Sequence, residues 1–128
     1  MNLNTQHSGK LFILSGPSGA GKGTICKELL EQTDLELSVS MTTRAPREGE
    51  IHGVHYYFVN EDEFVDRINN DGFLEHAQVY GRRYGTPKEP VIEKLEQGID
   101  VILEIDIQGA LKVKENSPDG VFIFILPP

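Results

Sequence analysis

The sequence predicts an α/β protein with a parallel sheet, crossover helices and an inserted mixed α/β subdomain. Two observations support the parallel sheet: short apolar runs alternate with amphipathic stretches near both ends of the chain, and a glycine-rich turn joins the first apolar run to the first helix. Strands that alternate with helices form parallel sheets whose crossovers pack on both faces. A third observation, the several short strand-like runs of the middle segment, predicts the insertion.

The first elements follow from hydrophobic periodicity. Residues 11–14 form a continuous apolar run and predict a buried strand, and residues 37–41 predict a second strand. Between them, apolar residues at i, i+4 spacing predict a helix over 24–32, with Cys26 on its buried face as a small core residue.

The middle segment contains turn, cap and strand signals. Residues 42–53 are polar and contain Pro46 and two glycines, which predicts a loop. Asn60 followed by Glu63 is a helix-start signal. We therefore expect a strand over 56–59, a helix from 60 to about 70, and strands over 73–79 and 82–84 that form a hairpin at Gly81.

The last third returns to the α/β pattern. Thr86, Pro87 and Glu89 predict a helix capped by Thr86 that ends at Gly98. A strand over 101–105, a helix over 107–116 and a strand over 121–126 follow. We assign residues 1–40 and 87–128 to the core and residues 41–86 to the inserted subdomain.

Composition limits the classes of partner. The net charge is −8, because twenty acidic residues oppose twelve basic ones, so we expect no nucleic-acid partner. No apolar run is long enough to span a bilayer and Cys26 is the single cysteine, so we expect a cytoplasmic protein without a membrane partner. The sequence does not indicate the oligomeric state.

The strongest local motif is a phosphate-binding loop between the first strand and the first helix. Glycines allow successive backbone N–H groups to point at one anion, and the helix N-terminus adds its positive dipole end. Lys22 is expected to reach the β- and γ-phosphates of ATP. The predicted ATP-binding residues are Gly16, Pro17, Ser18, Gly19, Ala20, Gly21, Lys22, Gly23 and Thr24.

The loop departs from the general pattern at one position. Gly23 stands where a serine or threonine would ligate magnesium, and Thr24 comes one residue later. We therefore expect no direct protein ligand to the metal: Mg²⁺ is held through ATP oxygens and water, near Thr24 and Asp106.

A second set of motifs carries a family resemblance. The run Ser-Met-Thr-Thr-Arg-Ala-Pro-Arg begins at Ser40 and is followed by Gly49-Glu50; Phe-Leu-Glu-His-Ala begins at Phe73, and Gly-Arg-Arg-Tyr-Gly-Thr ends at Thr86. Together with the phosphate loop, this combination resembles the guanylate kinase family from Leu11 to Pro128. The resemblance implies a P-loop NTPase-type fold and ATP and GMP as substrates.

The resemblance also implies roles for individual residues. Arg44 and Arg47 would hold the GMP phosphate, assisted by the hydroxyls of Tyr56 and Tyr84, and with Lys22 they would form the catalytic set. Ser40, Glu75 and Thr86 would bind guanine, with Asp106 either contacting the base or organising magnesium. The chemistry agrees, because a carboxylate can accept both N1–H and the 2-amino group of guanine, while a hydroxyl can donate to O6.

Two other functions stay open at this point. Guanylate-kinase-like modules bind phosphorylated peptides without catalysis, but the intact glycines and Lys22 favour an enzyme. A related sugar-phosphate kinase would not need guanine-binding residues such as Glu75. Members of the family continue beyond Pro128, so we expect these 128 residues to lack the lid and the last core elements and to turn over poorly.

Overall fold

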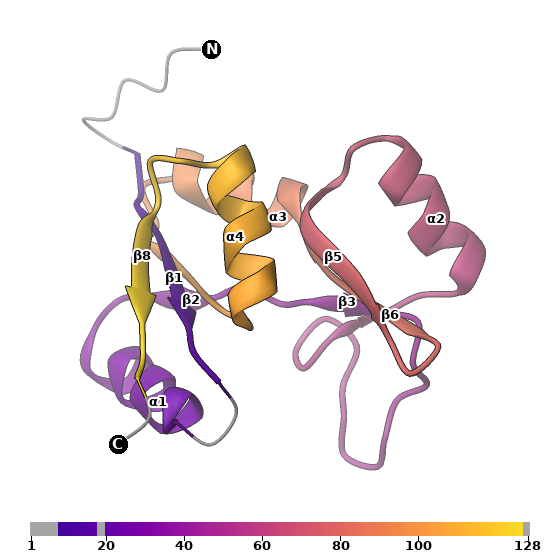
Figure 1. Ribbon diagram of the computed structural model, residues 1–128, viewed down its shortest axis with the longest axis horizontal. Helices are drawn as coiled ribbons and strands as arrows, with labels where there is room; N and C mark the ends of the chain where they lie inside the picture. The colour runs from indigo at the N-terminus through magenta and orange to yellow at the C-terminus, as the bar shows by residue number, and fades with distance from the viewer. Residues whose placement is uncertain (1–7, 18–19, 127–128) are drawn as a thin grey trace. The chain divides into compact units, whose positions relative to one another are not determined.

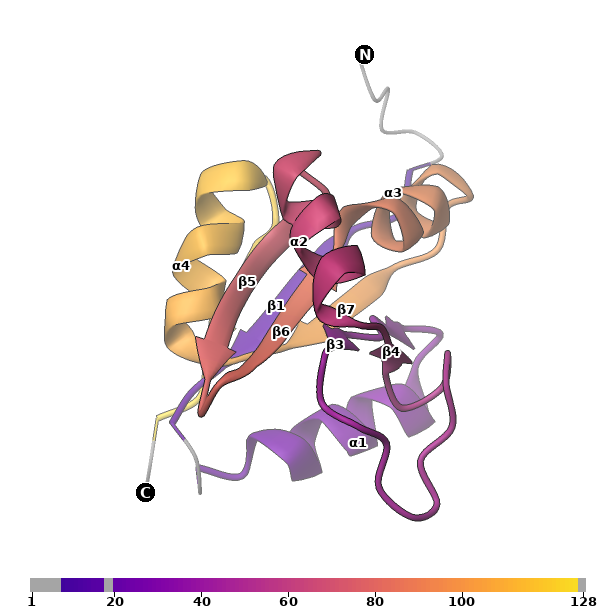
Figure 2. The same ribbon diagram turned by 90° about the vertical axis from the view of Figure 1, so that its right-hand side faces the viewer.

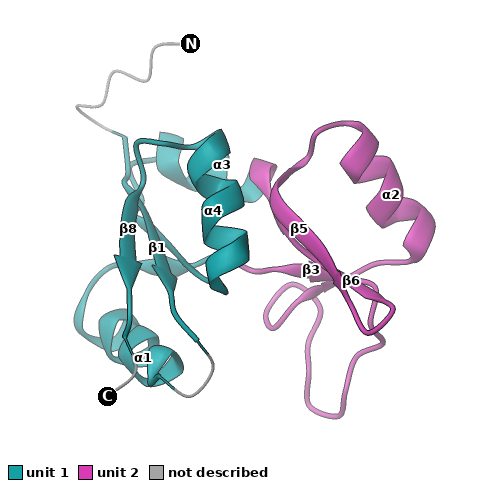
Figure 3. Cartoon of the chain, in the orientation of Figure 1, with its two compact units in different colours: residues 1–38, 90–128 teal, residues 39–89 magenta. Residues whose placement is uncertain are grey.

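The structure, a computed structural model, describes residues 8–17 and 20–126 (Figure 1). The chain divides into two compact units (Figure 3). The first comprises residues 1–38 and 90–128, and the second comprises residues 39–89. None of the helices in the described part is both long and apolar enough to cross a bilayer.

The first unit contains the predicted parallel sheet. Its strand order is β2-β7-β1-β8, and every neighbouring pair is parallel. The elements are β1 (Leu11–Ser15), α1 (Lys22–Gln32), β2 (Glu36–Leu37), α3 (Lys88–Glu96), β7 (Val101–Glu104), α4 (Ile107–Asn116) and β8 (Val121–Phe124). Because all four strands are parallel, the segments that follow β1 and β7 leave the sheet at the same edge.

Helices cover both faces of this sheet (Figure 2). On one face, Cys26 of α1 packs with Leu14 and Ile102 in a buried cluster. Side chains alternate along a strand, so Ile13 and Leu103 point to the opposite face, and both are fully buried. This two-sided burial explains why β1 and β7 are continuous apolar runs in the sequence.

The second unit has a mixed sheet with the order β4-β3-β6-β5. Its elements are β3 (Met41–Thr42), β4 (Tyr57–Phe58), α2 (Glu61–Asn69), β5 (Phe73–Val79) and β6 (Arg82–Pro87). The pair β3–β4 is parallel, and the other two pairs are antiparallel. Phe64 of α2 stacks on Phe73 of β5 with ring centroids 4.4 Å apart, so the helix and the sheet share a core.

Two local predictions in this unit are confirmed. Asn60 and Glu63 form a reciprocal capping box at the start of α2. Tyr80 and Gly81 have φ angles of 50° and 75° in the tight turn between β5 and β6. Two successive left-handed residues are what a two-residue hairpin turn requires.

The predicted strand over 37–41 is wrong as a single element. β2 pairs with β7 in the first unit, whereas Met41 pairs with Tyr57 and Gly85 in the second. The chain changes sheets between these two pairings. A continuous strand-like pattern does not reveal such a change, because either sheet accepts the same residue types.

The start of α3 also differs from the prediction. Thr86 lies in β6 and α3 begins at Lys88, so Thr86 does not cap that helix. Its hydroxyl instead donates to the Oε2 atom of Glu75, and Pro87 pairs with Phe73 across the hairpin. Smaller boundary shifts occur elsewhere: α1 begins two residues earlier than expected, and β4, β7 and β8 are shorter than the predicted strands.

Candidate functional site

The phosphate loop joins β1 to α1 in the first unit. Gly16 approaches the backbone of Ile125 so closely that an added Cβ would lie 2.7 Å from that carbonyl oxygen, which explains the requirement for glycine. Gly21 is the N-cap of α1, with a left-handed φ of 89°. Of the predicted ATP-binding residues, Ser18 and Gly19 lie outside the described residues.

An open cavity of about 590 Å³ lies at this loop. Its lining includes six residues of the loop and three at the end of β7 and the start of α4: Gly16, Pro17, Gly21, Lys22, Gly23, Thr24, Glu104, Asp106 and Ile107. The N-terminus of α1, with its positive dipole end, therefore borders the cavity. Such a helix end favours an anionic ligand.

Lys22 is the first residue of α1, and its Nζ donates to the carbonyl oxygen of Ile105 at 3.2 Å. This bond ties the loop to the end of β7. The lysine thus stands at the cavity as a mobile cation whose protein partner is a neutral carbonyl, which a phosphate group can replace.

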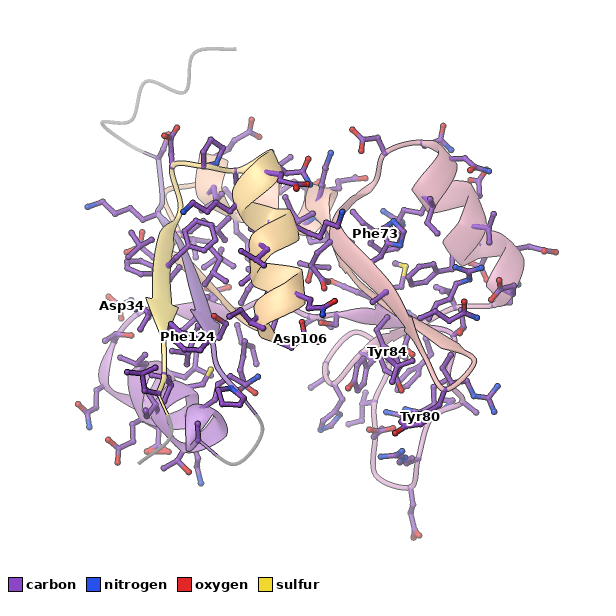
Figure 4. All side chains as sticks on the ribbon, viewed as in Figure 1. Asp34, Phe73, Tyr80, Tyr84, Asp106 and Phe124 are labelled. Atoms are coloured by element: carbon purple, nitrogen blue, oxygen red, sulfur yellow. The ribbon has the colours of Figure 1, made fainter. Side chains whose placement is uncertain are left out.

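Asp106 is the N-cap of α4, where its Oδ1 accepts a hydrogen bond from the Gly109 amide at 2.7 Å (Figure 4). Asp106 therefore has a structural role as a helix cap. Asp106 also lines the cavity together with Glu104, which precedes it by two residues. Two carboxylates and the nearby Thr24 give this cavity oxygen donors of the type that Mg²⁺ prefers.

A cluster in the second unit contains the predicted phosphate-binding arginines. The guanidinium of Arg44 donates to both carboxylate oxygens of Glu50, at 2.9 and 3.0 Å. The Arg47 amide also donates to Glu50, at 2.7 Å. Glu50 therefore holds Arg44 by its side chain and Arg47 by its backbone, while the Arg47 side chain is exposed.

Two aromatic residues border this cluster. Arg44 lies over the ring of Tyr56, 5.1 Å from the centroid, and the rings of Tyr56 and Tyr84 make an edge contact at 6.2 Å. The Glu50 carboxylate and the two phenol oxygens raise the pKa of Arg44 above its usual range. The structure thus brings Arg44, Tyr56 and Tyr84 together, as the sequence predicts.

The predicted guanine-binding residues lie beside this cluster. Glu75 of β5 and Thr86 of β6 are cross-strand partners, and the Thr86 hydroxyl donates to Glu75 at 2.9 Å. Tyr84 and Thr86 are two apart on one strand, so they project from the same face of β6. Ser40 immediately precedes β3, and its carbonyl accepts the amide of Tyr57.

Sequence reasoning gave no role to Glu50, although the Gly-Glu pair was part of the recognised motif. The signal that could have revealed it is its place six residues after Arg44, because a loop rich in turn residues can fold an acid back onto an arginine. Glu104 was likewise assigned no role from the sequence, and its position in the cavity becomes visible only when the end of β7 is placed beside the loop.

Comparisons with known proteins show the family of the chain. The guanylate kinase family model matches residues 8–128. A guanylate kinase from Clostridium acetobutylicum is 66% identical over 120 residues, which cover 94% of this chain and 57% of that protein. One from Caldanaerobacter subterraneus subsp. tengcongensis is 61% identical over 127 residues, covering 98% of this chain and 62% of the relative.

A solved structure supports the same relation. The crystal structure of guanylate kinase from Anaplasma phagocytophilum superimposes with a TM-score of 0.76 at 39% identity, covering 97% of this chain and 63% of that one. The chain thus spans about three fifths of the length of the relatives it matches. On its matched residues and its fold, the chain belongs to the guanylate kinase family.

Proposed function

We propose that the protein transfers the γ-phosphoryl group of ATP to GMP, giving ADP and GDP, and that it acts in the cytoplasm, where both nucleotides are available. One observation carries the proposal: the chain has two distinct candidate anion sites with different chemistry. The cavity beside Lys22 suits a triphosphate, and the cluster around Arg44 suits a phosphate monoester next to a base-recognising carboxylate.

The acceptor needs positioning more than it needs a base. The phosphate of GMP is already ionised near neutral pH, so we assign no general base to Glu104 or Asp106. The difficulty is to bring two polyanions together, and fixed cations reduce that cost. Lys22 serves the donor, and Arg44 and Arg47 serve the acceptor.

Magnesium fits the donor cavity through water. Among the described residues, no three His, Cys, Asp or Glu side chains gather into a metal-binding group. Thr24, Glu104 and Asp106 nevertheless line the cavity, so they could orient waters around a metal that the ATP oxygens hold. When bound, Mg²⁺ would neutralise charge on the β- and γ-phosphates.

Guanine selectivity is assigned to the pair Glu75 and Thr86. A carboxylate accepts hydrogen bonds and cannot donate them, so it matches the N1–H and 2-amino donors of guanine. Adenine carries an acceptor at N1 and would leave Glu75 mispaired. Such mispairing at a built polar site disfavours the wrong base by up to about 10⁴-fold.

The test is a nucleotide panel with Mg²⁺–ATP as donor and GMP, AMP, UMP or a sugar phosphate as acceptor, with ADP release as the readout. We expect ADP release with GMP as the acceptor and not with AMP, UMP or the sugar phosphate. GMP binding without ATP binding would support the non-catalytic module, and turnover with the sugar phosphate would support the related kinase. Because the chain spans only part of its relatives, the assay is run in parallel on the 128-residue chain and on the guanylate kinase from Clostridium acetobutylicum.

A further inference from the structure

All of the residues proposed to hold the GMP phosphate except Tyr84 lie in one segment, residues 44–56, which we call the acceptor loop. Arg44 and Tyr56 mark its two ends, and Glu50 lies near its middle. The loop has little regular structure: between β3 and β4 the described backbone has only an isolated bridge from His52 to Tyr56. Its shape must therefore come from turns and side-chain hydrogen bonds.

His55 closes the first of these turns. The Ile51 amide donates to Nδ1 of His55 at 2.9 Å, and the His55 amide donates back to the Ile51 carbonyl at 3.0 Å. This reciprocal pair fixes the backbone directly after Glu50. The position of Glu50 in turn sets the position of Arg44.

His52 accepts the second hydrogen bond that shapes the loop, at the edge of the sheet. Along the outer strand β4, the Tyr57 amide donates to the Ser40 carbonyl, just before β3, and the Val59 amide donates to the Thr42 carbonyl. The Phe58 amide between them therefore points away from the sheet. Nδ1 of His52 accepts that amide at 3.0 Å. This edge amide would otherwise bond to water. Its bond to His52 thus anchors β4, the strand that follows Tyr56, to the loop.

Both contacts require a neutral imidazole. A ring nitrogen accepts a hydrogen bond only while it carries a lone pair, and in the imidazolium ion both nitrogens are donors. Protonation therefore removes the acceptor from Ile51 and from Phe58.

Within the described ranges, neither His52 nor His55 forms an ion pair. The titratable ring packed against His52 is that of Tyr57, at 5.9 Å. The charged residues of the loop itself are Arg44, Arg47, Glu48 and Glu50, of which Glu50 is already bonded to Arg44.

We propose that His52 and His55 are positioning residues that hold the acceptor loop through neutral Nδ1 atoms, so that acid loosens the loop and weakens GMP binding. This inference rests on the proposed function for its GMP readout. Its structural part, the two amide contacts, can be tested without any ligand.

The first experiment follows the backbone amide NMR signals of Ile51 and Phe58 in the full chain without ligand, from about pH 7.5 to about pH 5.5. It compares the wild type with the double variant His52→Asn/His55→Asn. The asparagine Oδ1 takes the place of Nδ1 as acceptor but does not titrate. We expect both signals to shift in the wild type and to stay constant in the double variant; signals that do not move in the wild type would overturn the proposal.

The second experiment measures GMP dissociation constants over the same pH range. Protonation of the GMP phosphate affects all variants equally, so the ratio of wild type to double Asn variant isolates the histidines. We expect that ratio to rise about tenfold in acid, as for the loss of one to two hydrogen bonds. The variant His52→Phe/His55→Phe, which has rings but no acceptor, should bind weakly at every pH.

The outcomes separate the two proposals. Parallel pH profiles for the wild type and the Asn variant would reject the positioning role while leaving the kinase function intact. A failure of every variant to bind GMP near neutral pH would reject the proposed function, and the amide titration would still decide the role of the histidines.

Discussion

Glu50 and Arg44 form a two-pronged ion pair, in which each carboxylate oxygen of Glu50 accepts from a different guanidinium nitrogen of Arg44. The side chains are 20% and 11% exposed, so the pair is partly shielded from water. Such planar pairing fixes the orientation of the guanidinium as well as its position. Arg44 is therefore oriented by the protein itself rather than by a ligand.

This pair predicts a specific response to acid. Hydrogen bonds from Arg44 and the Arg47 amide lower the pKa of Glu50 from 4.5 to about 2. A carboxyl group whose pKa is lowered by folding stabilises the native state above its unfolded pKa and loses that contribution as the pH falls through the folded pKa. We expect Glu50→Gln to flatten the fall in unfolding free energy between about pH 4.5 and about pH 2.

Urea denaturation at several pH values measures this slope. Glu96→Gln, a change at an exposed position of α3, is the matched control and should retain the wild-type slope. Identical slopes for the wild type and Glu50→Gln would contradict the role of the pair.

Arg44→Lys tests whether the geometry matters beyond charge. A lysine keeps the positive charge but has no planar fork, so it cannot bond both Glu50 and a phosphate in fixed directions. We expect the GMP dissociation constant to rise by on the order of tenfold to a hundredfold. Calorimetric titration measures it, with Arg82→Lys at the exposed hairpin end as the control; equal affinity in both variants would mean that Arg44 acts only as a diffuse charge.

Much of the first unit could be predicted because its signals are local. The apolar runs of β1 and β7 reflect burial on both faces, and the glycine-rich turn has a direct backbone cause at Gly16 and Gly21. The helix predicted over residues 107 to about 116 is observed as α4, Ile107–Asn116, and Asp106 caps its start.

The second unit was harder, because its decisive contacts are not local. Thr86 had the sequence signature of a helix cap, but its hydroxyl bonds to Glu75, eleven residues away on the neighbouring strand. The change of sheet after Leu37 likewise depends on which strand edges are open, a property that no short pattern encodes. The ion pair between Glu50 and Arg44 was not predicted, because ion pairs within a loop depend on the path of the whole loop.

Glu75→Gln tests the assignment of guanine recognition. The amide replaces one acceptor oxygen by a donor, which opposes the N1–H and amino donors of guanine. We expect GMP affinity to fall by about a hundredfold and the preference over AMP to shrink. Paired GMP and AMP titrations measure both, and thermal unfolding confirms that the variant folds; an unchanged GMP affinity would favour the sugar-phosphate kinase.

Cys26 should be an inert thiol in the native protein. It is 2% exposed, and burial together with the nearby Glu104 carboxylate raises its pKa to about 11. Because the thiolate is the reactive form, we expect a thiol reagent to modify the folded chain far more slowly than the urea-unfolded chain. Spectrophotometric labelling at mildly alkaline pH measures both rates; comparable rates would show that α1 does not protect the thiol.

Lys22→Met separates the donor site from the acceptor site. Methionine keeps the length of the side chain and removes the cation that reaches the cavity, where Nζ now bonds the Ile105 carbonyl. We expect ATP affinity to drop by on the order of a hundredfold, the loss of one charge-assisted contact to phosphate, while GMP affinity stays within about twofold of the wild type.

Lys27→Met, on an exposed position of the same helix, should leave both affinities unchanged, so any effect of helix charge alone appears in that control. Fluorescence titrations measure the affinity of each of the two variants for ATP and for GMP. A parallel loss of GMP binding in Lys22→Met would contradict the assignment of the two phosphates to separate sets of residues, because the described contacts of Arg44 with Ala45, Glu50 and Tyr56 do not involve Lys22.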